Sequence, residues 1–250
     1  MRFVYALLAV FSITLFAFSV VLILPAYVII FLLFPKSKAP HAAHGLSRFW
    51  AYYVLMITFI RPVIKNKNLI DPKKTYIFIS NHQSQLYIPL YFISCRNTFR
   101  ILEKKELTKI PLLGYIIKNL YLTVDRADKN DRHKSIQTMS HSLLQEKISV
   151  FLCPEGTRNR TSGILLPFKD GAFRLSAETG VPIAALITYN SGSRNNPKQP
   201  LSLIPGTIEG EWLGVFDPPG KSSESVEKLK SDIYQLMENK IRTFRNEKER

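Results

Sequence analysis

Cysteine and acidic side chains are both scarce in this chain of 250 residues. Its two cysteines, Cys95 and Cys153, do not form a Cys-x-x-Cys spacing, so neither a disulfide framework nor a structural zinc site is indicated. The 19 acidic residues are outnumbered by 34 basic ones, and the formal net charge is +15. No zinc-finger, RNA-recognition or basic heptad pattern accompanies that charge, so we expect an anionic membrane surface as partner and no nucleic acid.

Charge is absent altogether from residues 3–34. A helix of that length would reach about 48 Å, against about 30 Å for the hydrocarbon core of a bilayer. Pro25 offers a break, so the segment is either one kinked helix or two helical pieces that dip into one leaflet. A second apolar run, Phe49–Ile60, is too short to cross. We therefore predict that residues 1–66 anchor the chain in a membrane, with the basic remainder on the cytoplasmic face.

The chain beyond residue 66 alternates strand-like and helix-like stretches, which is typical of an α/β fold. Strand-like runs lie near residues 75–80, 119–124, 148–153 and 182–188. Residues 131–147 carry Ile136, Met139, Leu143 and Leu144 at helical spacing, which predicts a core-facing helix. The stretch from Ser223 repeats this pattern and predicts an amphipathic helix that packs on the domain or on a membrane surface. Residues 190–200 predict a surface loop. We therefore expect residues 67–250 to form one domain.

Two short polar clusters each follow an apolar strand-like run. Ser80-Asn81-His82-Gln83-Ser84 follows the first run, and Pro154-Glu155-Gly156-Thr157-Arg158 follows the third. Binding and catalytic groups collect at strand ends in α/β sheets, so the two clusters predict one active site. His82 is the candidate base, because an imidazole suits proton transfer at neutral pH.

The second cluster has the chemistry of an anion site. Gly156 permits a tight turn, which lets backbone N–H groups and the Arg158 side chain converge on a phosphate. The guanidinium of Arg158 matches phosphate oxygens bidentately. Glu155 could hold that guanidinium or accept a hydrogen bond from a substrate hydroxyl, and Thr157 is expected to brace the turn. The alternative is a Glu–Arg ion pair on the surface of a turn.

Further short blocks extend these clusters into a longer pattern that resembles the lysophosphatidic acid acyltransferase (1-acylglycerol-3-phosphate O-acyltransferase) family. The similar region covers most of residues 75–188. The blocks are, in order, Asn81-His82, Lys104–Leu107, Pro111–Gly114, Val124–Arg126, Pro154–Arg158, Phe168–Phe173 and Val181–Ile183. The resemblance implies a single glycerolipid-acyltransferase-like α/β domain, with a central mixed β-sheet flanked by helices and N-terminal helices placed against the bilayer.

The resemblance also implies a reaction. A fatty acyl group would pass from acyl-CoA or acyl-carrier protein to the 2-hydroxyl of 1-acylglycerol 3-phosphate, with no metal or prosthetic group, and the product would be phosphatidic acid for phospholipid biosynthesis. His82 would deprotonate the hydroxyl, while Arg158, Glu155 and Arg126 would hold the phosphate. The full set of candidate substrate-binding residues is Arg126, Glu155, Gly156, Thr157, Arg158, Lys105 and Lys169.

One position departs from the family's pattern: Tyr87 stands where the His-x4-Asp box carries its aspartate. A carboxylate behind the imidazole fixes its tautomer and stabilises the imidazolium that forms. The neutral Tyr87 hydroxyl can orient His82 by accepting its ring N–H, but it cannot stabilise the charge.

Several alternatives therefore stay open at this point. One alternative is a slower enzyme. Another is an enzyme whose orienting carboxylate is supplied by a different residue, for which Asp125 is a candidate. The third is a catalytically impaired relative that binds membrane lipid. Another lysophospholipid is an alternative acceptor. A membrane-tethered nucleic-acid binder rests on the net charge of +15 alone.

Overall fold

The computed structural model describes residues 2–84, 86–125, 127–161, 163–196, 198–199 and 201–249. Within them, one seven-stranded sheet has the strand order β1-β7-β6-β2-β5-β3-β4. The strands are β1 (Ile60–Lys65), β2 (Ile77–Ser80), β3 (Phe99–Lys104), β4 (Leu122–Val124), β5 (Ser149–Leu152), β6 (Ile183–Tyr189) and β7 (Gly206–Phe216). The α-helices are α1 (Arg2–Leu33), α2 (Ala39–Ile57), α3 (Tyr87–Ser94), α4 (Leu113–Leu120), α5 (Lys129–Leu144), α6 (Gly171–Thr179), α7 (Ser191–Arg194) and α8 (Ser223–Glu249), and Lys67–Leu69 and Lys105–Lys109 are 3-10 turns.

The sheet is mixed, as the family resemblance implied. Strand β2 pairs in parallel with both β5 and β6, and β3 pairs in parallel with β5 and β4. Strand β7 runs antiparallel to β6 and parallel to β1. Every residue of β2, β5 and β6 is buried, which is why these strands are nearly continuous apolar runs in the sequence. The carboxyl ends of β2, β5 and β6 therefore meet at one edge of the sheet.

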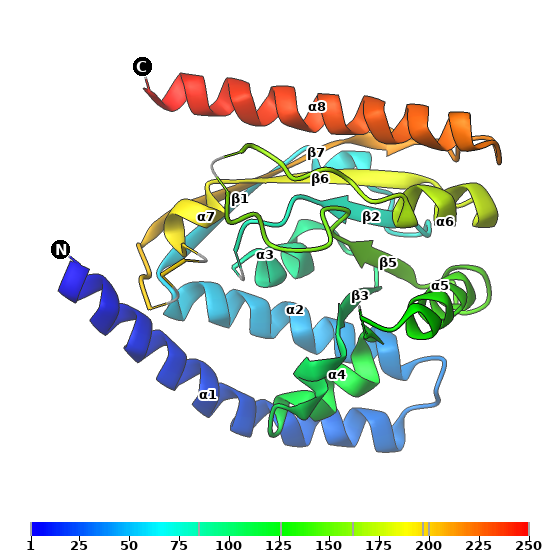
Figure 1. Cartoon of the computed structure of the whole chain (residues 1–250). Coiled ribbons are helices and arrows are strands. Elements are labelled where there is room, and N and C mark those ends of the chain that lie inside the picture. The colour runs from blue at the N-terminus through cyan, green and yellow to red at the C-terminus, as the bar shows by residue number, and fades with distance from the viewer. Residues whose placement is uncertain are drawn as a thin grey trace.

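Helices cover both faces of the sheet, so the fold has three layers (Figure 1). On one face, α2 and α3 pack over an aromatic core that includes Phe78, Phe99, Phe151 and Trp212. On the other face, α5, α6 and α8 enclose a second core, to which α8 contributes its buried apolar side chains. The C-terminal amphipathic helix thus packs on the sheet. The α/β fold class predicted from the sequence is confirmed.

Helix α1 continues through Pro25 as one helix of 32 residues, and Figure 1 shows that it bends along its length. It packs against α2 and α4 through a cluster centred on Tyr27, Ala43 and Ile116. Over Phe3–Leu33, α1 is long and apolar enough to cross a bilayer, and only 22% of its most apolar window is buried. A core helix of a soluble protein would be mostly buried, so this exposure indicates membrane association.

Helices α1 and α2 both carry exposed apolar side chains. They include Phe3, Leu22, Leu32 and Leu33 on α1, and Phe49, Tyr52 and Met56 on α2. Trp50 of α2 stacks on Phe16 of α1, with ring centroids 5.4 Å apart, and thereby ties the two helices together. Both N-terminal helices therefore expose large apolar side chains.

Several local features differ from the sequence predictions. Strand β1 lies inside the segment 1–66 and pairs with β7, so the expected membrane anchor also supplies an edge strand of the sheet. The predicted loop 190–200 contains the one-turn helix α7. Leu144 was expected on the core face of its helix, but its side chain is 38% exposed at the C-terminal end of α5.

Candidate active site

The catalytic candidate His82 lies just beyond the end of β2, where Asn81 fixes the chain. Asn81 is fully buried, and its Nδ2 donates to the carbonyl of Thr188 at 3.0 Å while its Oδ1 accepts from the Thr188 N–H at 2.8 Å. Thr188 belongs to β6, so the Asn81 side chain continues the β2–β6 ladder past the last residue of β2. The backbone that enters His82 is therefore held rigidly against the sheet.

The second polar cluster begins at the end of β5, the strand that pairs with β2 in the register Ile79↔Leu152. The buried carboxylate of Glu155 accepts from the backbone N–H of His82 through Oε1, at 2.6 Å. The backbone N–H of Asn159 donates to the His82 carbonyl at 2.7 Å. Both polar groups of the His82 main chain are thus bonded to the second cluster, and the two clusters form one site.

Glu155 is a structural carboxylate in this arrangement. Its second oxygen, Oε2, accepts from the backbone N–H of Leu166 at 2.8 Å, so the side chain joins the β2 loop to the segment beyond Arg158. Burial raises the pKa of Glu155 to about 7, and the hydrogen bonds from Leu166 and His82 oppose that rise. Since Glu155 is 3% exposed and its oxygens face these two amides, the alternative of a surface Glu–Arg pair is wrong.

Tyr87 stands beside His82 at the start of α3. Its hydroxyl lies 3.4 Å from Nε2 of His82, which is long for a hydrogen bond, and the two rings meet edge to face with centroids 4.8 Å apart. On its other side, Tyr87 packs on Tyr91 at 4.7 Å. Tyr87 therefore packs against the imidazole and offers it a weak polar contact in place of a carboxylate.

The turn at Gly156 brings a cation close to its backbone. Gly156 has a left-handed φ of +69°, and its N–H donates to the carbonyl of Cys153 at 2.9 Å. A Cβ at this position would lie 2.9 Å from Nζ of Lys169, and the left-handed backbone favours glycine. Thr157 is exposed on the same turn.

Arg158 differs from Glu155 in having no fixed protein partner. Its side chain is half-buried, and among the described residues it makes no ion pair and no side-chain hydrogen bond. A guanidinium that has no partner among the described residues and lies beside a glycine turn is available to an anionic ligand.

Comparison with known proteins identifies the family to which this site belongs. The family model described as Acyltransferase matches residues 61–188, slightly more than half of the chain. This chain is a member of the acyltransferase family. The family predicted from the sequence is thereby confirmed, and the membership makes acyl transfer the class of reaction.

Named relatives support the same family. An uncharacterised acyltransferase of Schizosaccharomyces pombe is 30% identical to this acyltransferase over 76% of the chain and 70% of that protein. The 1-acyl-sn-glycerol-3-phosphate acyltransferase of Haemophilus influenzae is 29% identical over 66% of the chain and 68% of that protein. In structure, the 1-acyl-sn-glycerophosphate acyltransferase PlsC of Thermotoga maritima has a TM-score of 0.81 at 21% identity, with 98% of each chain covered. This last likeness shows the fold.

Of the remaining candidates, Lys105 and Asp125 make contacts in their own part of the chain, and a third lies outside the described residues. Lys105 follows β3 and pairs with Asp131 of α5 at 3.8 Å. Arg126 is not among the described residues. Asp125, the candidate replacement for the missing aspartate, accepts from the backbone N–H of Ala127 and so caps its own turn.

The sequence did not predict that Asn81 and Asn159 fix the main chain around His82 through hydrogen bonds. Asn81 was recognised only as a neighbour of the base. Its position directly after an apolar strand was the available signal, because a carboxamide there can extend a ladder through both its donor and its acceptor.

Proposed function

We propose that this acyltransferase transfers a fatty acyl group from a thioester to the 2-hydroxyl of 1-acylglycerol 3-phosphate and thereby forms phosphatidic acid. The observation that carries the proposal is the clamp on His82, whose N–H is bonded to Glu155 and whose carbonyl is bonded to Asn159. Because Asn159 directly follows the half-buried Arg158, the clamp joins the base to the loop that carries this cation. The names of several relatives support this acceptor.

His82 acts as the general base in this mechanism. The imidazole takes the proton of the 2-hydroxyl while that oxygen attacks the thioester carbonyl; the tetrahedral intermediate then collapses, the carbon–sulfur bond breaks, and the thiolate leaves. The proton returns from the imidazolium to the thiolate. Tyr87 packs against the ring, with its hydroxyl 3.4 Å from Nε2, and adds no negative charge, so the imidazolium is stabilised less than by a carboxylate.

The phosphate of the acceptor binds at the Gly156 turn in this proposal. Arg158 and Lys169 supply positive charge, and backbone N–H groups of the turn supply donors. Glu155 positions His82 and the loop, and Thr157 braces the turn. Arg126 and Lys105 are assigned to the same phosphate or to the donor's phosphates on the family resemblance alone.

The surroundings of the site also enter the proposal. The exposed apolar surface of α1 and α2 lies in the membrane, so a lysophospholipid reaches His82 from the lipid while its phosphate stays in the polar region. The basic side chains that follow α1 support a location of the domain on the cytoplasmic face. The donor is acyl-CoA or acyl-carrier protein, and the reaction as proposed uses no metal or prosthetic group.

Acyl transfer measured on full-length protein in liposomes tests this function. Wild type, His82→Ala and Tyr87→Asp are supplied with 1-acylglycerol 3-phosphate and with acyl-CoA or acyl-carrier protein. We expect turnover by wild type and none by His82→Ala. If wild type is inactive with both donors and a panel of lysophospholipids, while Tyr87→Asp is active, the chain is a lipid-binding relative and the proposed function is wrong.

A further inference from the structure

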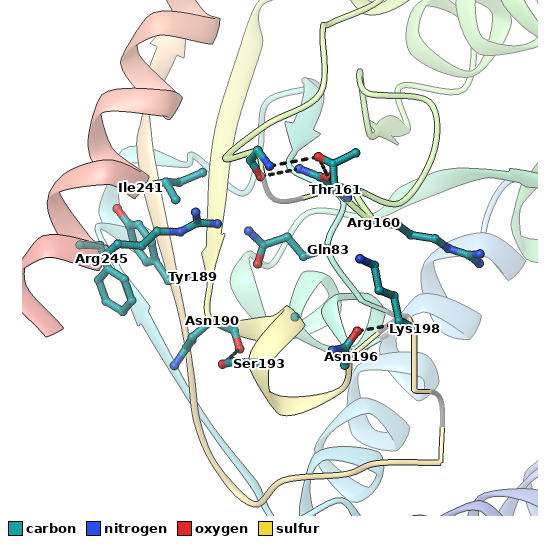
Figure 2. Close-up of a pocket in the computed structure, with 14 residues that line it drawn as sticks. Gln83, Arg160, Thr161, Tyr189, Asn190, Ser193, Asn196, Lys198, Ile241 and Arg245 are labelled. Atoms are coloured by element: carbon teal, nitrogen blue, oxygen red, sulfur yellow. Dashed lines mark hydrogen bonds between the residues drawn. The ribbon is translucent and has the colours of Figure 1, made fainter. Parts of the chain in front are cut away.

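A cavity of about 430 Å³ adjoins the segment that holds His82. Figure 2 shows Gln83 in its centre, with Arg245 of α8 reaching toward it from one side and Lys198 from the other. Asn159 and Arg160, from the loop of the second polar cluster, also line the cavity, and Figure 2 shows the Arg160 guanidinium directed away from Gln83. The cavity is therefore built where β2, the β5 loop, the segment after α7 and the end of α8 converge.

Two residues that line the cavity, Gln83 and Asn159, are next to His82 in the chain or bonded to its main chain. Gln83 directly follows His82, and its Oε1 lies 3.4 Å from the hydroxyl of the buried Ser191. The N–H of Asn159 donates to the His82 carbonyl at 2.7 Å. A molecule in this cavity is thus beside the reacting centre without occupying it.

The charge of the cavity is uniformly positive. Its cations are Arg160, Lys198 and Arg245, and no Asp or Glu is among the described residues that line it. None of the three makes an ion pair with another described residue, although Arg242, one turn earlier on α8, pairs with Glu238 at 3.7 Å. Uncompensated cations in a concave site concentrate positive potential and attract anionic ligands.

This positive region is distinct from the proposed acceptor site. Asn159 separates Arg158 from Arg160 in the chain, and Arg160 lines the cavity while Arg158 does not. One loop therefore presents cations in two places beside His82. Acyl transfer from a nucleotide thioester to a phosphorylated acceptor requires two such places, because both substrates are anionic at a distance from their reacting atoms.

We propose that the cavity binds the phosphorylated nucleotide end of acyl-CoA, a proposal that rests on the proposed acyl-transfer function. The pantetheine arm separates the thioester from the phosphates of CoA, so their site lies outside the reacting centre but within reach of that arm. A volume of about 430 Å³ falls in the range of small-molecule sites, roughly 300–1,000 Å³. Gln83 and Asn196 add polar side chains for ribose and base, whereas the side-chain amide of Asn190 is bonded to the main chain of Thr207 and Glu209. A carrier protein would instead dock through a broad acidic surface, which a small concave site does not match.

Steady-state kinetics on full-length protein test this assignment. The triple variant Arg160→Ala/Lys198→Ala/Arg245→Ala is compared with the matched control Arg242→Ala, with acyl-CoA and S-acyl-pantetheine as donors. We expect the KM for acyl-CoA to rise at least about tenfold in the triple variant, while the KM for S-acyl-pantetheine, the KM for the acceptor and kcat stay unchanged. The control is expected to behave as wild type with both donors.

Two kinetic outcomes overturn the proposal. One is an equal rise of KM for acyl-CoA and S-acyl-pantetheine, since the cavity would then not recognise the nucleotide. The other is a wild type that uses acyl-carrier protein and not acyl-CoA.

A binding measurement separates this proposal from the proposed function. Adenosine 3′,5′-bisphosphate, which carries no acyl group, is titrated calorimetrically into His82→Ala protein with and without the three cavity substitutions. Binding that is lost with the three substitutions supports the cavity site even if no acceptor is ever turned over. Equal binding by both proteins, with equal Tm, overturns it.

Discussion

The polar residues around His82 in this acyltransferase fall into two sets. Asn81 and Glu155 are buried, and their side-chain oxygens and nitrogen are bonded to main-chain groups of other segments. Arg158 and Arg160 lie on the same loop as Glu155 but have no ion pair among the described residues. The first set is a frame that holds the base, and the second is a set of cations available to ligands. Substitutions in the frame should therefore change kcat and stability, and substitutions of the cations should change KM.

Glu155→Ala is expected to have the largest effect. It leaves the buried N–H groups of His82 and Leu166 without their acceptor, which costs about 2 kcal/mol of unfolding free energy, and it displaces the base enough to lower kcat about 100-fold. Initial rates and thermal unfolding measure both effects. The exposed Glu178 of α6 provides the control, because Glu178→Ala should change neither. A Glu155→Ala protein with normal kcat and a raised acceptor KM would show instead that Glu155 binds substrate.

Arg158→Ala is expected to raise the KM for 1-acylglycerol 3-phosphate about 30-fold, since it removes a charge-assisted bidentate contact with the phosphate. Its Tm should equal that of wild type, because no described residue depends on the Arg158 side chain.

The conservative change Arg158→Lys sharpens the same test. Lysine keeps the charge but loses the planar fork, so its KM should fall between those of wild type and Arg158→Ala. A drop in Tm without a change in KM would place Arg158 in the frame and remove the contrast between the two sets.

The pH dependence of stability tests the state of Glu155. Its pKa in the folded protein is raised from 4.5 to about 7, so between these values the folded state keeps a proton that the unfolded state releases. The contribution of Glu155 to stability is therefore present below about pH 4.5 and is lost as pH rises to about 7. Relative to Glu155→Gln, which cannot titrate, wild type should lose on the order of 5 °C of Tm across this window. A constant Tm difference between the two proteins would contradict the raised pKa.

The elements that the sequence predicted and those it missed differ in burial. Strands β2, β5 and β6 are buried along their whole length, so their apolar runs indicated strands directly. Strand β1 contains Arg61 and Pro62 and is tolerated only because it lies at the edge of the sheet. Strand β7 carries three glycines, only three of its eleven positions are buried, and its partners β1 and β6 are distant in sequence. Such strands are stabilised by long-range pairing, which a local pattern does not contain.

The site shows the same limit. The positions of His82, Glu155 and Arg158 at strand ends could be predicted, because strand ends and turn residues are local signals. The role of Glu155 could not, since it depends on the register of β2 against β5 and on the approach of Leu166. Residues around 190–200 and at the end of α8 were read as a surface loop and a packing helix, and only the fold brings them together as a cavity beside Gln83.

Tyr87→Phe is expected to have the smallest effect. It tests whether Tyr87 belongs to the set of residues that holds the base. The hydroxyl lies 3.4 Å from Nε2 of His82, a distance at which a hydrogen bond contributes little, and phenylalanine keeps the ring contacts with His82 and Tyr91. We therefore expect kcat to fall by about threefold or less. Tyr91→Phe is the matched control, because the Tyr91 hydroxyl meets Cys153 at 3.5 Å. A fall in kcat of tenfold or more in Tyr87→Phe alone would mean that the hydroxyl orients the imidazole in the reacting complex. Tyrosine would then perform part of the role of the absent aspartate, and Tyr87 would belong to the set of residues that holds the base.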